Sequence, residues 1–337
     1  MIKKYFIILV VILGGIIGLA YLIDQPKVEP GISSKPISKS IGDGLAFLAQ
    51  AHSPYHYKDA YLEYVYPSEE LDCSLPGCNI TYRILDAYFD VTMLKRQLNF
   101  TGQEVIREQI LESEAVYQDI VPIWQEANIY NTLKSAEADQ GGLAIDTYCI
   151  LGYLQKDGAM AKRALDYLDE SGEWLAEDAF PVDTWRNIAD ETWCMRLLAV
   201  TDTEPDNYGQ MIQAKIEQTR EFVDSDEPDS SKLGTLYHML MFLSESDIQT
   251  SQAAVNELQQ EIFKLEQTGA FNQDAVALAN IIEALTVSNY YDEAYIANLA
   301  DRLISLQLSD GSWRAGPQQL YPVFSSFRAL IALATFR

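Results

Sequence analysis

Apolar residues recur at helical spacing along most of the chain after residue 40, and no stretch alternates steadily between apolar and polar positions. Recurrence at every third or fourth position is typical of amphipathic α-helices, so the pattern predicts an all-α protein. Twelve helices are expected, at residues 41–52, 79–95, 103–120, 143–155, 157–170, 188–200, 206–223, 231–244, 251–266, 272–287, 292–307 and 322–336.

The predicted helices alternate between two kinds of composition. Residues 143–155 and 322–336 are rich in Ala, Leu, Ile and Tyr with few charges, whereas 157–170 and 251–266 are amphipathic and charged. A helix that is apolar on most faces must be enclosed, while an amphipathic helix lies outside with one face in water. Twelve helices that alternate outer and inner make six hairpins. Closing these hairpins on themselves predicts a double-walled ring of helices over residues 41–337.

A 45-residue period supports this repeat. It is marked by four aspartates that each open a helical stretch, Asp157, Asp202, Asp247 and Asp292. Self-similarity at a period between 20 and 50 residues is typical of one supersecondary unit used several times. We interpret each aspartate as the N-cap of an outer helix, where its carboxylate accepts hydrogen bonds from free backbone N–H groups.

A glycine two residues before a large aromatic roughly shares this register. It occurs in Gly172-Glu-Trp174, Gly269-Ala-Phe271 and Gly311-Ser-Trp313. The glycine is expected to end an outer helix in a left-handed turn, and the aromatic to fill the seam before the next hairpin.

The segment Leu306-Gln-Leu-Ser-Asp-Gly-Ser-Trp313 resembles the Gln-Trp repeat of the terpenoid cyclase and protein prenyltransferase superfamily, and Leu320 to Leu330 resembles the entry to an inner helix of those proteins. The resemblance covers the repeat architecture of about residues 40–337 and implies an (α/α)6 toroid. It does not extend to the Asp-x-Asp-Asp proton donor of squalene-hopene cyclases or to the Asp-x-Cys zinc pair of prenyltransferase β subunits. The same fold carries lanthionine cyclases, polysaccharide-processing enzymes and thioester domains, so it does not select a function.

The first 24 residues have the pattern of an export segment. Lys3 and Lys4 precede 19 residues without a charge, Tyr5 to Ile23. This length suits a transmembrane helix, and the flanking charges place the N-terminus in the cytoplasm and the bulk of the chain outside. A signal peptide cleaved after Gly18-Leu-Ala20 is the alternative, which would give a secreted protein. Residues 25–40, rich in Pro and Ser, are expected to form a flexible tether.

The net charge of −25 argues against nucleic acid as a partner, because an acidic surface repels phosphate backbones. The expected partners are the membrane, through the predicted N-terminal helix, and an exported ligand such as a glycan. In an oxidising compartment cysteines tend to pair, and Cys73 and Cys78 flank a tight Pro-Gly turn. We expect a local disulfide between them.

Three hairpins contribute residues that a zinc ion prefers. Cys149, Cys194 and His238 are separated by 45 and 44 residues and fall on successive inner helices. Two thiolates, an imidazole and an open position suit a catalytic zinc, the one cofactor that the sequence indicates. A strict register would instead place Met239 level with the cysteines. A Cys149–Cys194 disulfide and inert packing of all three side chains stay open.

Acidic and aromatic residues gather near the presumed centre of the ring. Carboxylate pairs beside stacking aromatics suit the binding or cleavage of glycans. The candidate catalytic residues are Asp146, Asp183, Asp190 and Glu191. The candidate ligand-binding residues are Arg83, Tyr148, Trp185, Trp193 and Arg328. As alternatives, the acids cap helix N-termini, and the arginines pair with acids of the inner wall, Asp90 among them.

The sequence therefore favours a membrane-anchored, extracytoplasmic toroid that binds an exported ligand such as a glycan in a central cavity. It does not decide whether the protein is an enzyme. Three other hypotheses stay open: a glycan-processing hydrolase or lyase, a zinc-dependent enzyme, and a non-enzymatic interaction module of the cell envelope.

Overall fold

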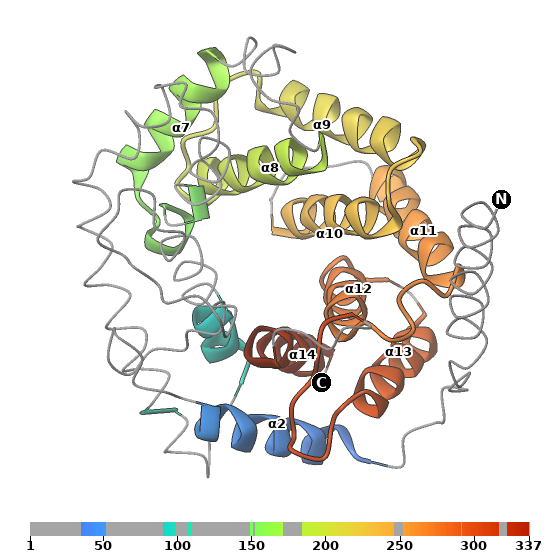
Figure 1. Ribbon diagram of the computed structural model, residues 1–337. Coiled ribbons are helices and arrows are strands. Elements are labelled where there is room, and N and C mark those ends of the chain that lie inside the picture. The colour runs from blue at the N-terminus through green and yellow to red at the C-terminus, as the bar shows by residue number, and fades with distance from the viewer. Residues whose placement is uncertain are drawn as a thin grey trace, which may run out of the picture. The chain divides into compact units, whose positions relative to one another are not determined.

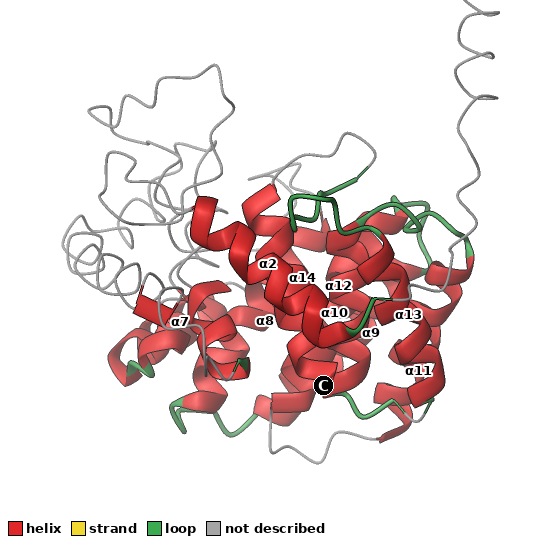
Figure 2. Ribbon diagram, turned by 90° about the horizontal axis from the view of Figure 1, so that it is seen from below, coloured by secondary structure: helices red, strands yellow, loops and turns green. Residues whose placement is uncertain are grey.

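The chain forms two compact units, Met1–Ile32 and Ser33–Arg337. A computed structural model describes part of the second unit, namely residues 35–51, 90–98, 107–108, 149–150, 152–170, 184–245, 252–290, 292–316 and 322–336. Within these residues the regular elements are helices and no strand occurs, which confirms the all-α prediction (Figure 2).

The labelled helices are α2 (Ile37–Ala51), α7 (Gly158–Glu170), α8 (Thr184–Val200), α9 (Tyr208–Val223), α10 (Asp229–Glu245), α11 (Gln252–Gln267), α12 (Ala275–Val287), α13 (Glu293–Ser305) and α14 (Pro322–Phe336). Residues 90–97, 107–108, 149–150 and 152–155 are also helical. Each labelled helix overlaps one predicted from the apolar spacing, and the boundaries differ by a few residues.

The described helices lie in an inner and an outer layer (Figure 1). In the inner layer α8 packs against α10, α10 against α12, and α12 against α14. In the outer layer α9 packs against α8 and α10, α11 against α10, α13 against α12 and α14, and α7 against α8. Consecutive helices therefore alternate between the layers, as the alternation in composition predicts.

Burial follows from this placement. In the inner helix α12, Leu278, Ile281 and Leu285 are fully buried, and the small residues Ala279 and Ala284 on its other faces are buried as well. In the outer helix α11 the buried apolar residues are confined to one face. A helix enclosed on most sides has no face on which charge can be hydrated, which explains why the inner helices carry so few charges.

The two ends of the second unit pack together, because α2 contacts both α13 and α14. The Gln307 amide donates to the Ser40 carbonyl at 2.9 Å, and the Ser40 hydroxyl donates to Gln307 at 2.7 Å. Trp313 is fully buried, and its indole N–H donates to the Leu303 carbonyl at 2.8 Å. A methyl group added to Gly44 of α2 would lie 2.6 Å from the Trp313 ring, so this glycine lets the ring reach α2.

Two of the four periodic aspartates are confirmed as N-caps. Asp157 accepts from the backbone N–H groups of Ala159 and Met160 at 2.8 and 3.1 Å, and Asp292 accepts from Tyr295 at 2.9 Å. Asp247 lies outside the described residues.

The N-cap prediction for Asp202 is wrong. Asp202 has a positive φ of 52° in the turn after α8, and α9 begins six residues later, after Asn207. The physical reason is the loop. The carbonyl of Pro205 accepts from the N–H of Tyr208, so the helix starts beyond the position that the 45-residue period indicates.

The glycines of two Gly-x-aromatic marks have the left-handed backbone that was expected, with φ of 77° at Gly269 and 89° at Gly311. Their aromatics, Phe271 and Trp313, are buried. At Gly311 an added Cβ would lie only 2.3 Å from the carbonyl oxygen of Asp43, so glycine is required there by close approach as well as by φ. The third mark, Gly172 to Trp174, lies outside the described residues.

In the part of the chain that the structure describes, no helix combines the length and the apolar character needed to cross a bilayer. The predicted anchor at residues 1–24 and the predicted Cys73–Cys78 disulfide both lie outside that part.

Candidate functional site

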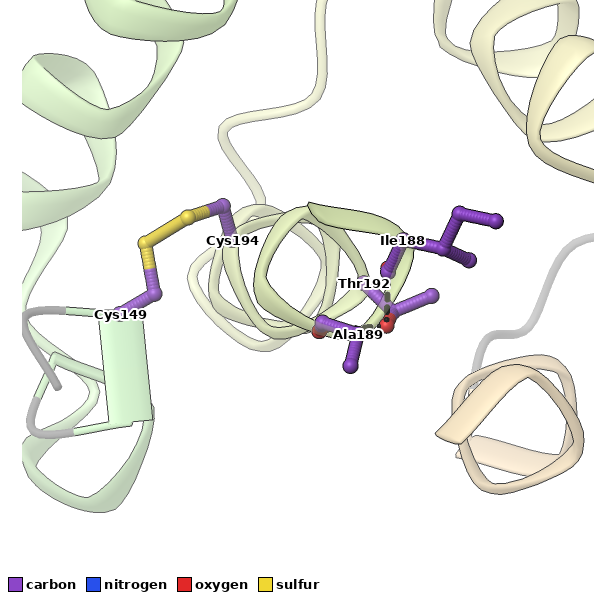
Figure 3. The surroundings of a disulfide bond; sticks show 5 residues. All are labelled: Cys149, Ile188, Ala189, Thr192 and Cys194. Atoms are coloured by element: carbon purple, nitrogen blue, oxygen red, sulfur yellow. Dashed lines mark hydrogen bonds between the residues drawn. A yellow bond between two sulfur atoms is a disulfide. The ribbon is translucent and has the colours of Figure 1, made fainter. Parts of the chain in front are cut away.

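Cys149 and Cys194 form a disulfide with a Cα–Cα distance of 4.8 Å across 45 residues of sequence (Figure 3). Figure 3 shows Cys194 on one side of α8 and Ile188 and Thr192 on the other. The bond links two inner segments, and both sulfur atoms are fully committed to it. A zinc ligand must be a thiolate, so the structure corrects the predicted zinc site at Cys149, Cys194 and His238 in favour of the disulfide alternative.

His238 lies on α10, next to the disulfide-bearing helix α8. Its ring packs at the edge of Trp193, with ring centroids 6.0 Å apart, and the side chain is half-buried. Its ring nitrogens form no hydrogen bond with a described residue. Burial, with the positive charges of Arg196 and Arg328 as smaller causes, lowers the pKa of His238 to about 3. His238 is therefore neutral at physiological pH, with hydrogen-bonding capacity that its described surroundings leave unused.

A buried polar cluster centred on Arg328 lies on the neighbouring inner helices. We call Arg328, Glu283, Tyr237, Asn280 and Asp90 the Arg328 cluster. One terminal nitrogen of Arg328 donates to Glu283 at 2.5 Å, to the Tyr237 hydroxyl at 2.6 Å and to the Asn280 carbonyl oxygen at 3.0 Å. Its other terminal nitrogen lies 3.5 Å from Asp90. The cluster thus draws on α10, α12, α14 and the helical residues 90–97.

The ion pairs of this cluster are shielded from water, since Arg328, Glu283 and Asp90 are 5%, 1% and 2% exposed. Burial lowers the pKa of Arg328, but the negative charge of Glu283 and further hydrogen-bonding partners outweigh it and raise that pKa well above its ordinary value. Tyr237 donates to Glu283 at 3.0 Å, which satisfies a further lone pair of the carboxylate. Pairing of Arg328 with an inner-wall acid, one of the two alternatives drawn from the sequence, is confirmed.

Asp90 differs from the other members of the cluster. Burial raises its pKa to about 7, and the attraction of Arg328 offsets the burial only in part. One of its oxygens faces Arg328, while the other, Oδ2, is buried without a hydrogen-bond partner among the residues that the structure describes. A buried carboxyl with a free oxygen and a pKa near neutrality can both donate and accept a proton at physiological pH.

Arg196 of α8 packs against two aromatic residues of the inner layer, Trp193 and Tyr153. Its guanidinium lies 3.9 Å above the Trp193 ring and 4.8 Å above the Tyr153 ring. It also donates to both carboxylate oxygens of Glu245, at 2.7 and 2.8 Å. Trp193 is 5% exposed, so it holds its neighbours in place and does not offer an open face for stacking.

Among the other candidates from the sequence, the structure describes the side chain of Glu191. Glu191 forms an ion pair with Lys215 of the outer helix α9, so its carboxylate faces away from the Arg328 cluster. The predicted catalytic role of Glu191 is therefore not supported by its placement. The side chains of Asp190 and Trp185 are not described, and Arg83, Asp146, Tyr148 and Asp183 lie outside the described residues.

Glu283 and Asn280 are absent from the residues predicted from the sequence, although a signal for Glu283 is present. Trp193, His238, Glu283 and Arg328 stand 45 residues apart each time, and Tyr148 precedes them by the same interval. Equivalent positions of a repeat lie at one level of the inner layer. Counting back from Arg328 in steps of 45 residues, and not from the cysteines, identifies the helix positions at which the Arg328 cluster lies.

Comparison with protein-family models, with curated proteins and with solved structures finds no match for this chain. The geometry of the site is therefore the basis on which its chemistry can be judged. The site combines a carboxyl with a raised pKa, a second carboxylate held by an arginine, a neutral imidazole and an amide.

Proposed function

We propose that this chain is a membrane-anchored, extracytoplasmic (α/α)6 toroid that binds a neutral glycan at its inner helices. We further propose that Asp90 exchanges a proton with the bound glycan. The toroid is supported by the alternation of inner and outer helices and by the contact of α2 with α13 and α14. Export is supported by the Cys149–Cys194 disulfide, because stable disulfides are rare in reducing compartments.

The ligand class follows from charge and hydrogen-bonding capacity. The net charge of −25 disfavours anionic polymers. The groups of the site that remain partly exposed are His238, which is neutral, and the amide of Asn280. A neutral imidazole and an amide offer both donors and acceptors without a charge, which suits the hydroxyl groups of a sugar.

The observation that carries the proposal is the state of Asp90. Its pKa of about 7 and its unpartnered Oδ2 are the properties required of a general acid. Glu283 supplies the second carboxylate. Both acids bind the same guanidinium through opposite terminal nitrogens, so Arg328 lies between the two carboxylates. Arg328 then positions both acids.

The experiment uses the full-length protein in detergent and a panel of neutral polysaccharides, with release of reducing ends as the readout. Asp90→Asn keeps the size and hydrogen bonding of the side chain but cannot donate an acidic proton. It should lower turnover by a factor of about 100 to 10,000. Asp206→Asn, at an exposed aspartate, is the matched control and should leave turnover unchanged. Full activity of the Asp90→Asn protein would remove Asp90 from the mechanism.

A non-enzymatic interaction module is the second candidate. It is favoured by the nearly complete burial of Arg328, Glu283 and Asp90, because ion pairs so well enclosed can serve the fold alone. In that case the wild-type protein neither binds nor cleaves any glycan of the panel, and Asp90→Asn changes stability only.

A further inference from the structure

A pocket of about 410 Å³ lies at the C-terminal ends of α8 and α10, about one to two helical turns from the level of the Arg328 cluster. Arg196 and Glu245, which pair with each other, form part of its wall. The volume is that of a site for a small molecule. The proposed glycan chemistry uses none of the residues that line this pocket.

The exposed charged residues that line the pocket are two cations from before α8 in the chain and two anions from after it. The cation Arg96 comes from the helical segment 90–97, and the cation Lys156 from the turn after residues 152–155; both precede α8 in the chain. The anions Asp202 and Glu204 come from the loop that follows α8. All four side chains are exposed, and none of them forms an ion pair within the part of the chain that the structure describes. Two unpaired cations and two unpaired anions therefore border one hollow.

The backbone at two of these positions is left-handed. Lys156 and Asp202 have positive φ of 54° and 52°, in the turn that ends each inner segment. In both turns the next residue donates its N–H to the carbonyl five positions back, Asp157 to Gly152 and Thr203 to Leu198. Glycine adopts this left-handed backbone without strain, whereas a side chain as long as lysine rarely does. Asp202 also places a negative charge at the negative end of a helix.

A third inner helix ends in the same turn, and it provides a comparison. Asn289 has φ of 56° after α12, and Tyr290 donates to the Leu285 carbonyl. Asparagine is among the residues that tolerate this backbone best, and Asn289 does not line the pocket. Lys156 thus holds a left-handed position at a conformational cost, whereas Asp202, like Asn289, is of a residue type that tolerates this backbone. Strain retained where glycine would relieve it is typical of a binding site.

From this arrangement we infer that the pocket binds a small zwitterion of the amino acid or short peptide class, with the carboxylate of the ligand at Arg96 and Lys156 and its ammonium group at Asp202 and Glu204. An arginine and a lysine suit a carboxylate, because each forms charge-assisted hydrogen bonds with it. A purely anionic ligand would meet Asp202 and Glu204, and a purely cationic one would meet Arg96 and Lys156. The presence of two cations and two anions around one pocket favours a ligand that carries both charges.

The test uses calorimetric titration of the full-length protein in detergent with alanine and with its di-, tri- and tetrapeptides. At least one of them should saturate the protein. Its N-acetylated form lacks the ammonium group, and its C-terminal amide lacks the carboxylate, so each should bind at least about tenfold more weakly. Absence of saturation by all four probes would overturn the inference. If the N-acetylated form binds as tightly as the parent compound, the pocket is a site for anions only. If the C-terminal amide binds as tightly, the pocket is a site for cations only. Either result would overturn the inference.

A substitution that relieves strain separates binding from folding. Lys156→Gly should leave the melting temperature unchanged or raise it, because glycine accepts the left-handed backbone, and should weaken ligand binding by about tenfold or more. Asn289→Gly changes an equivalent turn outside the pocket and should leave binding unchanged. If Lys156→Gly binds the ligand as tightly as the wild type, or if Asn289→Gly weakens binding to the same extent, the assignment fails. Neither outcome bears on the glycan assay, which reports on Asp90.

Discussion

Replacement of Asp90 by asparagine should change how the stability of the protein depends on pH. The carboxyl has a pKa of about 7 in the folded chain, in place of its ordinary value of 3.8. Each factor of ten in an ionisation constant corresponds to 1.36 kcal/mol, so the buried, ionised Asp90 destabilises the fold by about 4 kcal/mol. Asparagine has nearly the same shape, can accept from Arg328 through its amide oxygen, and does not ionise.

The sign of the effect follows from where the proton is held. Below pH 3.8 Asp90 is protonated in both the folded and the unfolded chain, and burial of the neutral group carries no charge penalty. Between pH 4 and 7 the unfolded chain loses the proton while the folded chain keeps it, so the free energy of unfolding falls as the pH rises. Above pH 7 both forms are ionised and the loss is complete. Among the described residues, the charged groups that face Asp90 are Arg328 from α14 and Glu283 from α12.

The assay is urea unfolding of the wild type and of Asp90→Asn at a series of pH values from 5 to 8.5. This range stays above the isoelectric point of about 4.3, where proteins associate. Relative to Asp90→Asn, the wild type should lose about 2.5 kcal/mol of stability across the series. Asp206→Asn, at an exposed position, should run parallel to the wild type. If the curve of Asp90→Asn is also parallel to that of the wild type, the carboxyl is not buried in the way described.

Three further changes test the fold. The double variant Cys149→Ala/Cys194→Ala should lower the free energy of unfolding by up to about 4 kcal/mol, which is the chain-entropy value for a 45-residue loop. A reductant should lower the stability of the wild type by the same amount and leave the double variant unchanged. Gly311→Ala should lower the free energy of unfolding by about 2 kcal/mol or more, because residue 311 has a positive φ and an added Cβ would meet the Asp43 carbonyl. Gly209→Ala, where the added Cβ meets open space, should change the free energy of unfolding by less than about 1 kcal/mol. Arg196→Met should destabilise by about 2 kcal/mol by leaving Glu245 unpaired, and a double-mutant cycle with Glu245→Gln should recover most of this as coupling energy.

For the labelled helices, the positions and the assignment to the inner or outer layer were accessible from the sequence, because apolar spacing reports directly on which faces are buried. The local caps at Asp157 and Asp292 were accessible for a similar reason, since a cap depends on residues next to it in the chain. Asp202 departs from the same period because cap formation depends on the loop between the helices. The six residues from Asp202 to Asn207 make their own turn before α9 begins.

The contents of the site were less accessible. Two residues along a helix correspond to a rotation of about 200°, which places Glu191 on the face opposite Trp193 and towards α9. Spacing alone did not decide between a disulfide and a metal site at Cys149 and Cys194, because both need the same approach of the two helices. Glu283 resembles an ordinary helix carboxylate until Arg328, 45 residues later, is counted in the same register.

The measurement that tests the account most directly is a structure of the Asp90→Asn protein with an oligosaccharide that the glycan panel identifies, since this variant should retain the uncleaved ligand. The account predicts density for a sugar ring at the inner helices, with a hydroxyl or the glycosidic oxygen within hydrogen-bonding distance of residue 90 and further contacts to His238 and Asn280. Sugar density confined to the outer helices, or an Arg328 cluster that stays closed to the ligand, would contradict it.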